Sequence, residues 1–159
     1  MIPAPAAARR DYTRYPGCFA GITGTDLADC SFGKVDDPKI PHVVLVGDSH
    51  AQMLMPALEQ LVKEDKISLT AQLKGSCAWS RDPINHWEQA RVDSCQTWRA
   101  KLQPWLIERA PTTDLIITTG YARFNSGTPA EQVESMQAAW KPLADLGVPI
   151  VAVRDNPRH

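Results

Sequence analysis

Long apolar runs and an excess of one charge are both missing from this sequence of 159 residues. No uninterrupted apolar stretch is longer than the four residues Val43–Val46, whereas a membrane-spanning helix needs roughly 20. The 17 lysine and arginine residues nearly balance the 18 aspartate and glutamate residues, which leaves a formal net charge of -1. We therefore expect no transmembrane helix in this chain, and its charge favours neither nucleic acid nor an anionic membrane as a partner.

The first ten residues also lack the layout of a secretory signal peptide. Their two arginines follow a short apolar stretch broken by proline, which is the reverse of the usual order. We expect any export signal to lie outside this sequence. Hydrophobic residues make up 43% and charged residues 22%, values typical of a folded domain, and the length fits one such domain.

The four cysteines lack the close spacing of a zinc or redox motif, so we expect no metal site. Two sequence-local disulfides, Cys18–Cys30 and Cys77–Cys95, are one of three possible pairings. They would suit loop-rich segments in an oxidising compartment. The alternative is four reduced and buried cysteines, and the spacing does not decide between the two.

Residues 1–40 show no clear hydrophobic period, which predicts an extended, disulfide-stapled lead-in rather than a domain. The ordered domain is expected over residues 41–159. In this region short apolar runs predict strands, and apolar stripes at helical spacing predict helices. The expected strands are 42–47, 67–73, 115–120 and 148–153, and the expected helices are 51–63, 95–109 and 129–146.

Prolines and glycines refine the expected helices. Pro56 predicts either a kink or the effective first turn of the first helix, and Pro104 weakens the prediction of the second. Pro129 suits the first position of the third helix behind a Thr128 cap, and Gly147 suits its C-terminal end. The alternation of strands and helices predicts an α/β fold, with a parallel sheet covered by helices on both faces.

Ligands bind such sheets at the carboxyl ends of the strands, so the segments that follow the strands are candidate sites. Asp48, Ser49 and His50 come directly after the first strand and before a helix. A serine on this kind of turn exposes its hydroxyl, and the adjoining helix N-terminus stabilises an oxyanion. Ser49 is therefore a candidate nucleophile, although Asp-Ser before a helix is also a common N-cap.

The Gly-Asp-Ser-His sequence at 47–50, placed after an apolar strand, resembles the first block of the SGNH (GDSL-like) hydrolases. Together with the cysteines and Cys-x-x-Trp at 95–98, it is similar to the SGNH domains fused to bacterial family-3 membrane acyltransferases. The resemblance covers roughly residues 18–157 and implies a three-layer, flavodoxin-like fold. The strand before the motif and the helix after it make the match more specific than four residues alone.

The resemblance also implies roles for individual residues. Ser49 would be the nucleophile that accepts the acyl group, and its backbone N–H would be one oxyanion donor. Gly75, after the second strand, and Gly120, after the third, match the glycines that would supply further N–H donors. Independently of the resemblance, we expect Asp48 to support the turn by accepting hydrogen bonds from loop N–H groups rather than to act as a catalyst.

The sequence departs from the family pattern at two places. Ala122 stands where the family has an asparagine that completes the oxyanion hole, so we expect Arg123 or Asn125 to supply a donor or a substrate contact. Asp155 and His159 are one residue further apart than in the family's Asp-x-x-His motif, and a proline lies between them. We therefore expect the general base to follow residue 159, with Asp155 and His159 as the alternative pair.

Three further side chains near these segments have expected roles. Trp79 and Trp87, in the loop after Gly75, are candidates for a substrate rim that stacks on sugars. His50 is expected to orient a loop through a hydrogen bond rather than to act as the base for Ser49, because neighbouring side chains diverge at such a turn.

The function implied by the resemblance is that of an extracytoplasmic domain in a bacterial O-acyltransferase system. An acyl group delivered by a membrane acyltransferase domain would pass to Ser49 and then to a hydroxyl of a cell-envelope glycan or glycolipid. This chemistry needs no metal or organic cofactor, and hydrolysis is the same mechanism with water as acceptor. The alternative is a non-catalytic remnant or glycan-binding module that keeps the fold but lacks the base.

Overall fold

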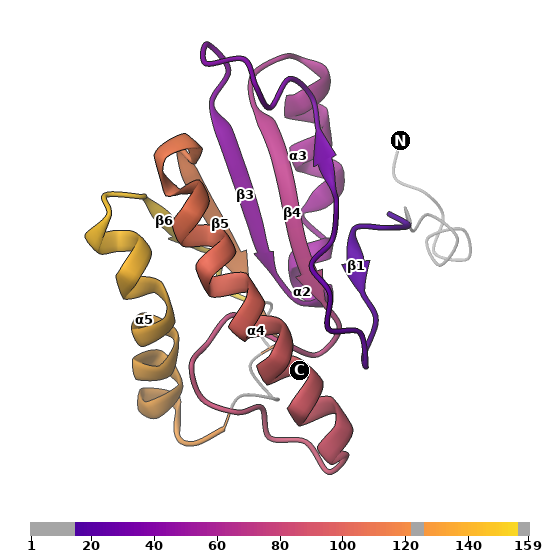
Figure 1. Cartoon of the computed structure of the whole chain (residues 1–159), viewed down its shortest axis with the longest axis vertical. Coiled ribbons are helices and arrows are strands. Elements are labelled where there is room, and N and C mark those ends of the chain that lie inside the picture. The colour runs from indigo at the N-terminus through magenta and orange to yellow at the C-terminus, as the bar shows by residue number, and fades with distance from the viewer. Residues whose placement is uncertain (1–14, 122–125, 156–159) are drawn as a thin grey trace.

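A six-stranded sheet forms the centre of the computed structural model, which describes residues 15–121 and 126–155 (Figure 1). The strands are β1 (Phe19–Ala20), β2 (Ser31–Phe32), β3 (His42–Gly47), β4 (Ser68–Lys74), β5 (Leu115–Thr119) and β6 (Ile150–Ala152). In the order β1-β4-β3-β5-β6 all neighbouring strands are parallel, and β2 pairs antiparallel with β4.

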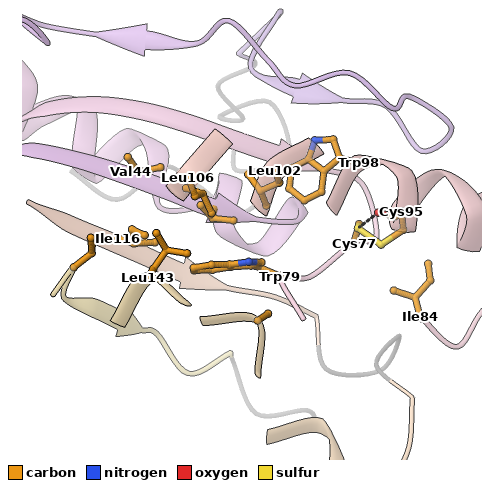
Figure 2. Close-up of a cluster of buried hydrophobic side chains, with 13 residues drawn as sticks. Val44, Cys77, Trp79, Ile84, Cys95, Trp98, Leu102, Leu106, Ile116 and Leu143 are labelled. Carbon is orange, nitrogen blue, oxygen red and sulfur yellow. Dashed lines mark hydrogen bonds between the residues drawn. A yellow bond between two sulfur atoms is a disulfide. The ribbon is translucent and has the colours of Figure 1, made fainter. Parts of the chain in front are cut away.

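Helices cover both faces of this sheet and enclose two hydrophobic cores. They are α2 (Ser49–Gln52), α3 (Met55–Lys63), α4 (Gln89–Arg109) and α5 (Pro129–Asp145). Because successive strand side chains point to opposite faces, Val43 and Leu45 join the core under α2 and α3, whereas Val44 joins the core under α4 and α5. Figure 2 shows this second core, whose members include Val44, Ile116, Trp98, Leu102, Leu106 and Leu143. The predicted three-layer α/β fold is confirmed.

The helix boundaries differ from the expected ones at two places. The chain breaks between α2 and α3, and Pro56 lies in the first turn of α3, which is the second of the two alternatives. Helix α4 begins at Gln89 rather than at residue 95. The sequence pattern missed these first residues because they are largely exposed and carry no apolar stripe. Pro104 is accommodated inside α4. Thr128 caps α5, as the sequence indicated, and Glu131 completes a capping box that the sequence analysis did not predict.

The segment expected to be an extended lead-in contributes β1 and β2 to the sheet. Strands of two residues leave no periodic signal, which is why the sequence did not predict them.

Lys74 at the end of β4 is fully buried, and its ammonium donates hydrogen bonds to the carbonyl oxygens of Gly21, Ile22 and Gly24. Since an ammonium has three N–H donors, this cage of carbonyls satisfies it and ties the lead-in to the sheet.

Both expected disulfides are confirmed. Cys18 and Cys30 join with their Cα atoms 4.8 Å apart, and Cys77 and Cys95 join with theirs 5.6 Å apart. Within residues 15–121 and 126–155, no helix combines the length and hydropathy that a membrane span requires.

We expect the buried Lys74 to make stability rise with pH in the alkaline range. Burial lowers the pKa of Lys74 from its ordinary 10.5 to about 8. Between these values the unfolded chain binds more protons than the native one, so deprotonation favours the native state. Relative to Lys74→Met, the wild type should gain about 2 kcal/mol of unfolding free energy between pH 7 and pH 9.5. Urea unfolding at the two pH values measures this, and equal changes in both proteins would contradict it.

Candidate functional site

Ser49 is the first residue of α2 and directly follows the turn from β3, at the carboxyl edge of the sheet. Gly47 ends β3 with a φ of +154°, and a Cβ atom placed on it would lie 2.2 Å from the carbonyl oxygen of Thr119 in β5. Only glycine permits this close approach of the two strand ends. Ser49 itself is exposed, whereas Asp48 beside it is buried. The serine therefore occupies the position that the sequence predicted for it.

The buried Asp48 carboxylate holds this turn against the loop after β5. Its Oδ1 accepts a hydrogen bond from the His50 backbone N–H at 2.9 Å, and its Oδ2 accepts one from the Tyr121 backbone N–H at 2.7 Å. Burial raises the pKa of the Asp48 carboxyl, and the two N–H donors oppose that rise. This arrangement agrees with the supporting role that we expected for Asp48.

His50 contacts both of the loops that follow β5 and β6. Its Nδ1 lies 2.6 Å from Oδ1 of Asp155, beyond the end of β6. Its ring packs against that of Tyr121, with the ring centroids 4.7 Å apart. His50 thus makes a loop-orienting hydrogen bond of the kind we expected. The partner itself was not predicted, because 105 residues separate the two positions and no local pattern links them.

The expectation that Gly75 supplies an oxyanion donor is wrong. Its backbone N–H donates to the carbonyl oxygen of Ala20 at 3.1 Å, which continues the pairing of β1 with β4. A Cβ atom on Gly75 would also meet the side chains of Ile22 and Phe19, so this glycine lies against the lead-in. The sequence missed this because it placed the lead-in outside the sheet.

Trp79 is also misplaced by the sequence prediction. Its side chain is 2% exposed, packs in the core under α4 and α5, and donates from Nε1 to Gln103 at 3.2 Å. A buried indole cannot form a substrate rim. Trp87 is different, because it is 81% exposed and one face of its ring is stacked on His86, with centroids 4.0 Å apart.

Gly120 follows β5 at the same edge and packs against the loop after β4. A Cβ atom on Gly120 would lie 2.6 Å from the Cβ of Ala78 and 3.6 Å from Oδ2 of Asp48. Ala78 is held in turn by Arg99 of α4, whose Nε and Nη2 donate to its carbonyl oxygen at 2.9 Å and 2.6 Å. Gly120 therefore lies beside the turn that carries Ser49, and its role as an oxyanion donor stays a prediction.

Several predicted site residues lie outside the described residues: Arg123 and Asn125, the Ala122 that replaces the family's asparagine, and His159. Asp155 is described, and there it binds His50. The Asp155–His159 pair therefore stays a prediction.

A large cavity lies at the opposite edge of the sheet. It has a volume of about 810 Å³, and His42, Thr70 and Asp114, near the amino ends of the central strands, line part of it. It is therefore separate from the serine turn. Among residues 15–121 and 126–155 no group of side chains is arranged to hold a metal ion.

The fold and the serine turn define an α/β domain with a candidate nucleophile at the carboxyl edge of a parallel sheet. The chain belongs to the SGNH family, since the family model described as "SGNH domain (fused to AT3 domains)" matches residues 16–159. This confirms the resemblance seen in the sequence. No curated protein matches the chain significantly.

A solved structure supports the same fold. The chain is similar to the periplasmic domain of a lipopolysaccharide acetyltransferase from Salmonella ser. Paratyphi A, with a TM-score of 0.60 and 11% sequence identity. The match covers 73% of this chain and 45% of that chain. At this identity the likeness concerns the fold, and this chain matches less than half of the length of its structural neighbour.

Proposed function

We propose that this domain performs serine-dependent acyl transfer through an ester on Ser49. The observation that carries the proposal is the exposed Ser49 on a turn fixed by Gly47 and by the buried Asp48, in a chain of the SGNH family. Covalent catalysis requires a nucleophile that is held in a fixed position near the substrate, and the turn holds Ser49 in this way.

The proposed reaction has two steps. Ser49 Oγ attacks the carbonyl carbon of an acyl donor and loses its proton to a base, and the leaving group departs with a proton. In the second step a hydroxyl of the acceptor attacks the ester, and Ser49 regains its proton. The Ser49 N–H and the Gly120 N–H are the proposed oxyanion donors. Within this sequence His159 is only the alternative candidate for the base, and it lies outside the described residues.

The proposed acyl donor is one delivered by a membrane acyltransferase domain, and the proposed acceptor is a cell-envelope glycan or glycolipid. The family description, which names fusion to AT3 domains, supports the first. The exposed ring of Trp87 supports the second, because an open aromatic face can stack on a sugar. Two disulfides and the periplasmic location of the structural neighbour support an extracytoplasmic domain.

A fluorophosphonate probe tests this proposal, because Ser49 Oγ would displace fluoride from phosphorus and keep a covalent label. We expect labelling of the wild type on the peptide that contains Ser49, and loss of that label in Ser49→Ala. Ser31→Ala is the matched control, since Ser31 is also exposed but belongs to β2. Its labelling should equal that of the wild type. Mass spectrometry of the digested protein measures all three.

An unlabelled wild type would overturn catalysis by this chain and favour the second candidate, a glycan-binding module. The exposed and singly stacked Trp87 is the observation that favours that candidate. Equal labelling of wild type and Ser49→Ala would instead show that another group reacts.

A further inference from the structure

We propose that His50 and Asp155 form a positioning pair that holds the loops after β5 and β6 against the turn of Ser49. The proposal rests on the proposed function, since it concerns the same site. Neither residue is placed in contact with the reacting atoms. The pair would act by fixing the position of the nucleophile and of the segments around it.

The contact between Asp155 and His50 lies beyond the end of β6. Just after β6, the Val153 N–H still donates to the Thr118 carbonyl oxygen of β5 at 2.8 Å. Asp155 is two residues further along and turns back to His50. Its side chain is 21% exposed and that of His50 is 36% exposed, so the contact is partly shielded from solvent. Partial shielding strengthens a hydrogen bond to a carboxylate.

The hydrogen bond to Asp155 also fixes the orientation of the imidazole. A carboxylate only accepts hydrogen bonds, so the pair proposed here has the proton on Nδ1 of His50, which donates to Oδ1 of Asp155. The ring then lies against Tyr121 at an interplanar angle of 34°. The Tyr121 backbone N–H is in turn bound by Asp48. Asp48, His50, Tyr121 and Asp155 thus connect three strand ends around one serine.

The geometry argues against a direct role of His50 as the base for Ser49. The two residues are neighbours at the start of α2, and side chains at i and i+1 of a helix do not face each other. A positioning role needs only the Nδ1–H donor, whereas a base would need Nε2. A substitution that keeps a donor at the position of Nδ1 but removes Nε2 should therefore preserve a positioning role and abolish a role as base.

Labelling rates of Ser49 with the fluorophosphonate probe test the pair. We expect His50→Ala and Asp155→Ala each to slow labelling about tenfold, because a small displacement of a nucleophile is costly. The double variant should be no slower than either single one, since both remove the same contact. His50→Asn, whose amide nitrogen lies near the position of Nδ1, should restore the rate to within about threefold of the wild type.

Three results would overturn the positioning role. If His50→Asn is as slow as His50→Ala, Nε2 is required. If the losses multiply in the double variant, the two residues act separately. If His50→Ala reacts at the wild-type rate, the contact between His50 and Asp155 does not affect the reactivity of Ser49. Asp145→Ala is the matched control, because it breaks the exposed ion pair of Asp145 with Lys141 and should leave the rate unchanged.

A spectroscopic measurement separates failure of the pair from failure of the proposed function. If the wild type is not labelled, the proposed function fails, but nitrogen-15 NMR still reports on the pair. We expect the His50 proton on Nδ1 in the wild type, and a changed amide shift of Tyr121 in Asp155→Ala. A proton on Nε2 alone, with none on Nδ1, or a Tyr121 amide that does not respond, would overturn the pair without reference to activity.

Discussion

Replacing Arg99 by methionine should lower the free energy of unfolding by about 4 kcal/mol. Arg99 is 7% exposed, and its guanidinium donates to the carbonyl oxygens of Ala78 and Asp82 and to the Ser80 hydroxyl. Methionine fills much of the same volume but leaves these acceptors without a donor. Losing hydrogen bonds to a charged group costs more than losing the apolar contacts of its stem.

The burial of Arg99 is itself costly, which limits the expected loss. Desolvation lowers the pKa of Arg99 to about 10, so part of the hydrogen-bond energy offsets the removal of a charge from water. Urea unfolding at pH 7 measures the net effect. Arg99→Lys should recover less than half of the loss, because an ammonium cannot reach acceptors on several sides at once.

The matched control for Arg99 is Arg109→Met. Arg109 belongs to the same helix, and its side chain is 42% exposed and stacked over Trp105. Its replacement should change stability by less than about 1 kcal/mol. Equal losses at the two positions would contradict the view that the guanidinium of Arg99 holds the loop after β4.

Gly47→Ala should destabilise the protein by about 3 kcal/mol and displace the nucleophile. The new Cβ atom would lie 2.2 Å from the carbonyl oxygen of Thr119 and 2.7 Å from the Cβ of Ala51. Both neighbours belong to regular elements, so β3, β5 or α2 would have to move. Because Ser49 is two residues away, we also expect loss of fluorophosphonate labelling at temperatures where the variant is still folded.

Gly21→Ala is the matched control for Gly47, since a Cβ atom there would meet nothing within 4 Å. We expect it to leave both stability and labelling unchanged. Thermal unfolding followed by circular dichroism, together with the labelling assay, measures the two effects. A Gly47→Ala protein with wild-type stability would show that the ends of β3 and β5 can separate without cost.

The central part of the fold follows from local sequence patterns. The apolar run before Gly47 and the run 115–120 predicted buried parallel strands. The structure has parallel strands at 42–47 and 115–119, but alternate residues of the second strand are only partly buried. The position of Ser49 was predicted for the same reason, because the turn follows directly from a strand that ends in glycine and meets a helix.

The surroundings of Ser49 could not be predicted, because they depend on contacts between distant positions. Asp155 meets His50 across 105 residues, and the Gly75 N–H is used by a two-residue strand that no pattern reveals. Trp79 was expected at the surface because its segment is a loop, yet the loop folds into the core. Local patterns indicate which elements form, whereas these partners are chosen by packing.

The two disulfides brace two short segments of the chain and leave the carboxyl-terminal elements without a covalent cross-link. The disulfides close the loops 18–30 and 77–95, while α5, β5 and β6 contain no cysteine and are held by packing and by the hydrogen bonds of the sheet. β6 is a three-residue strand whose Val151 is 47% exposed, so its backbone amides should exchange with deuterated solvent sooner than those of β4. The site therefore joins Ser49, which follows the central strand β3, to Asp155, which follows the edge strand that we expect to open first.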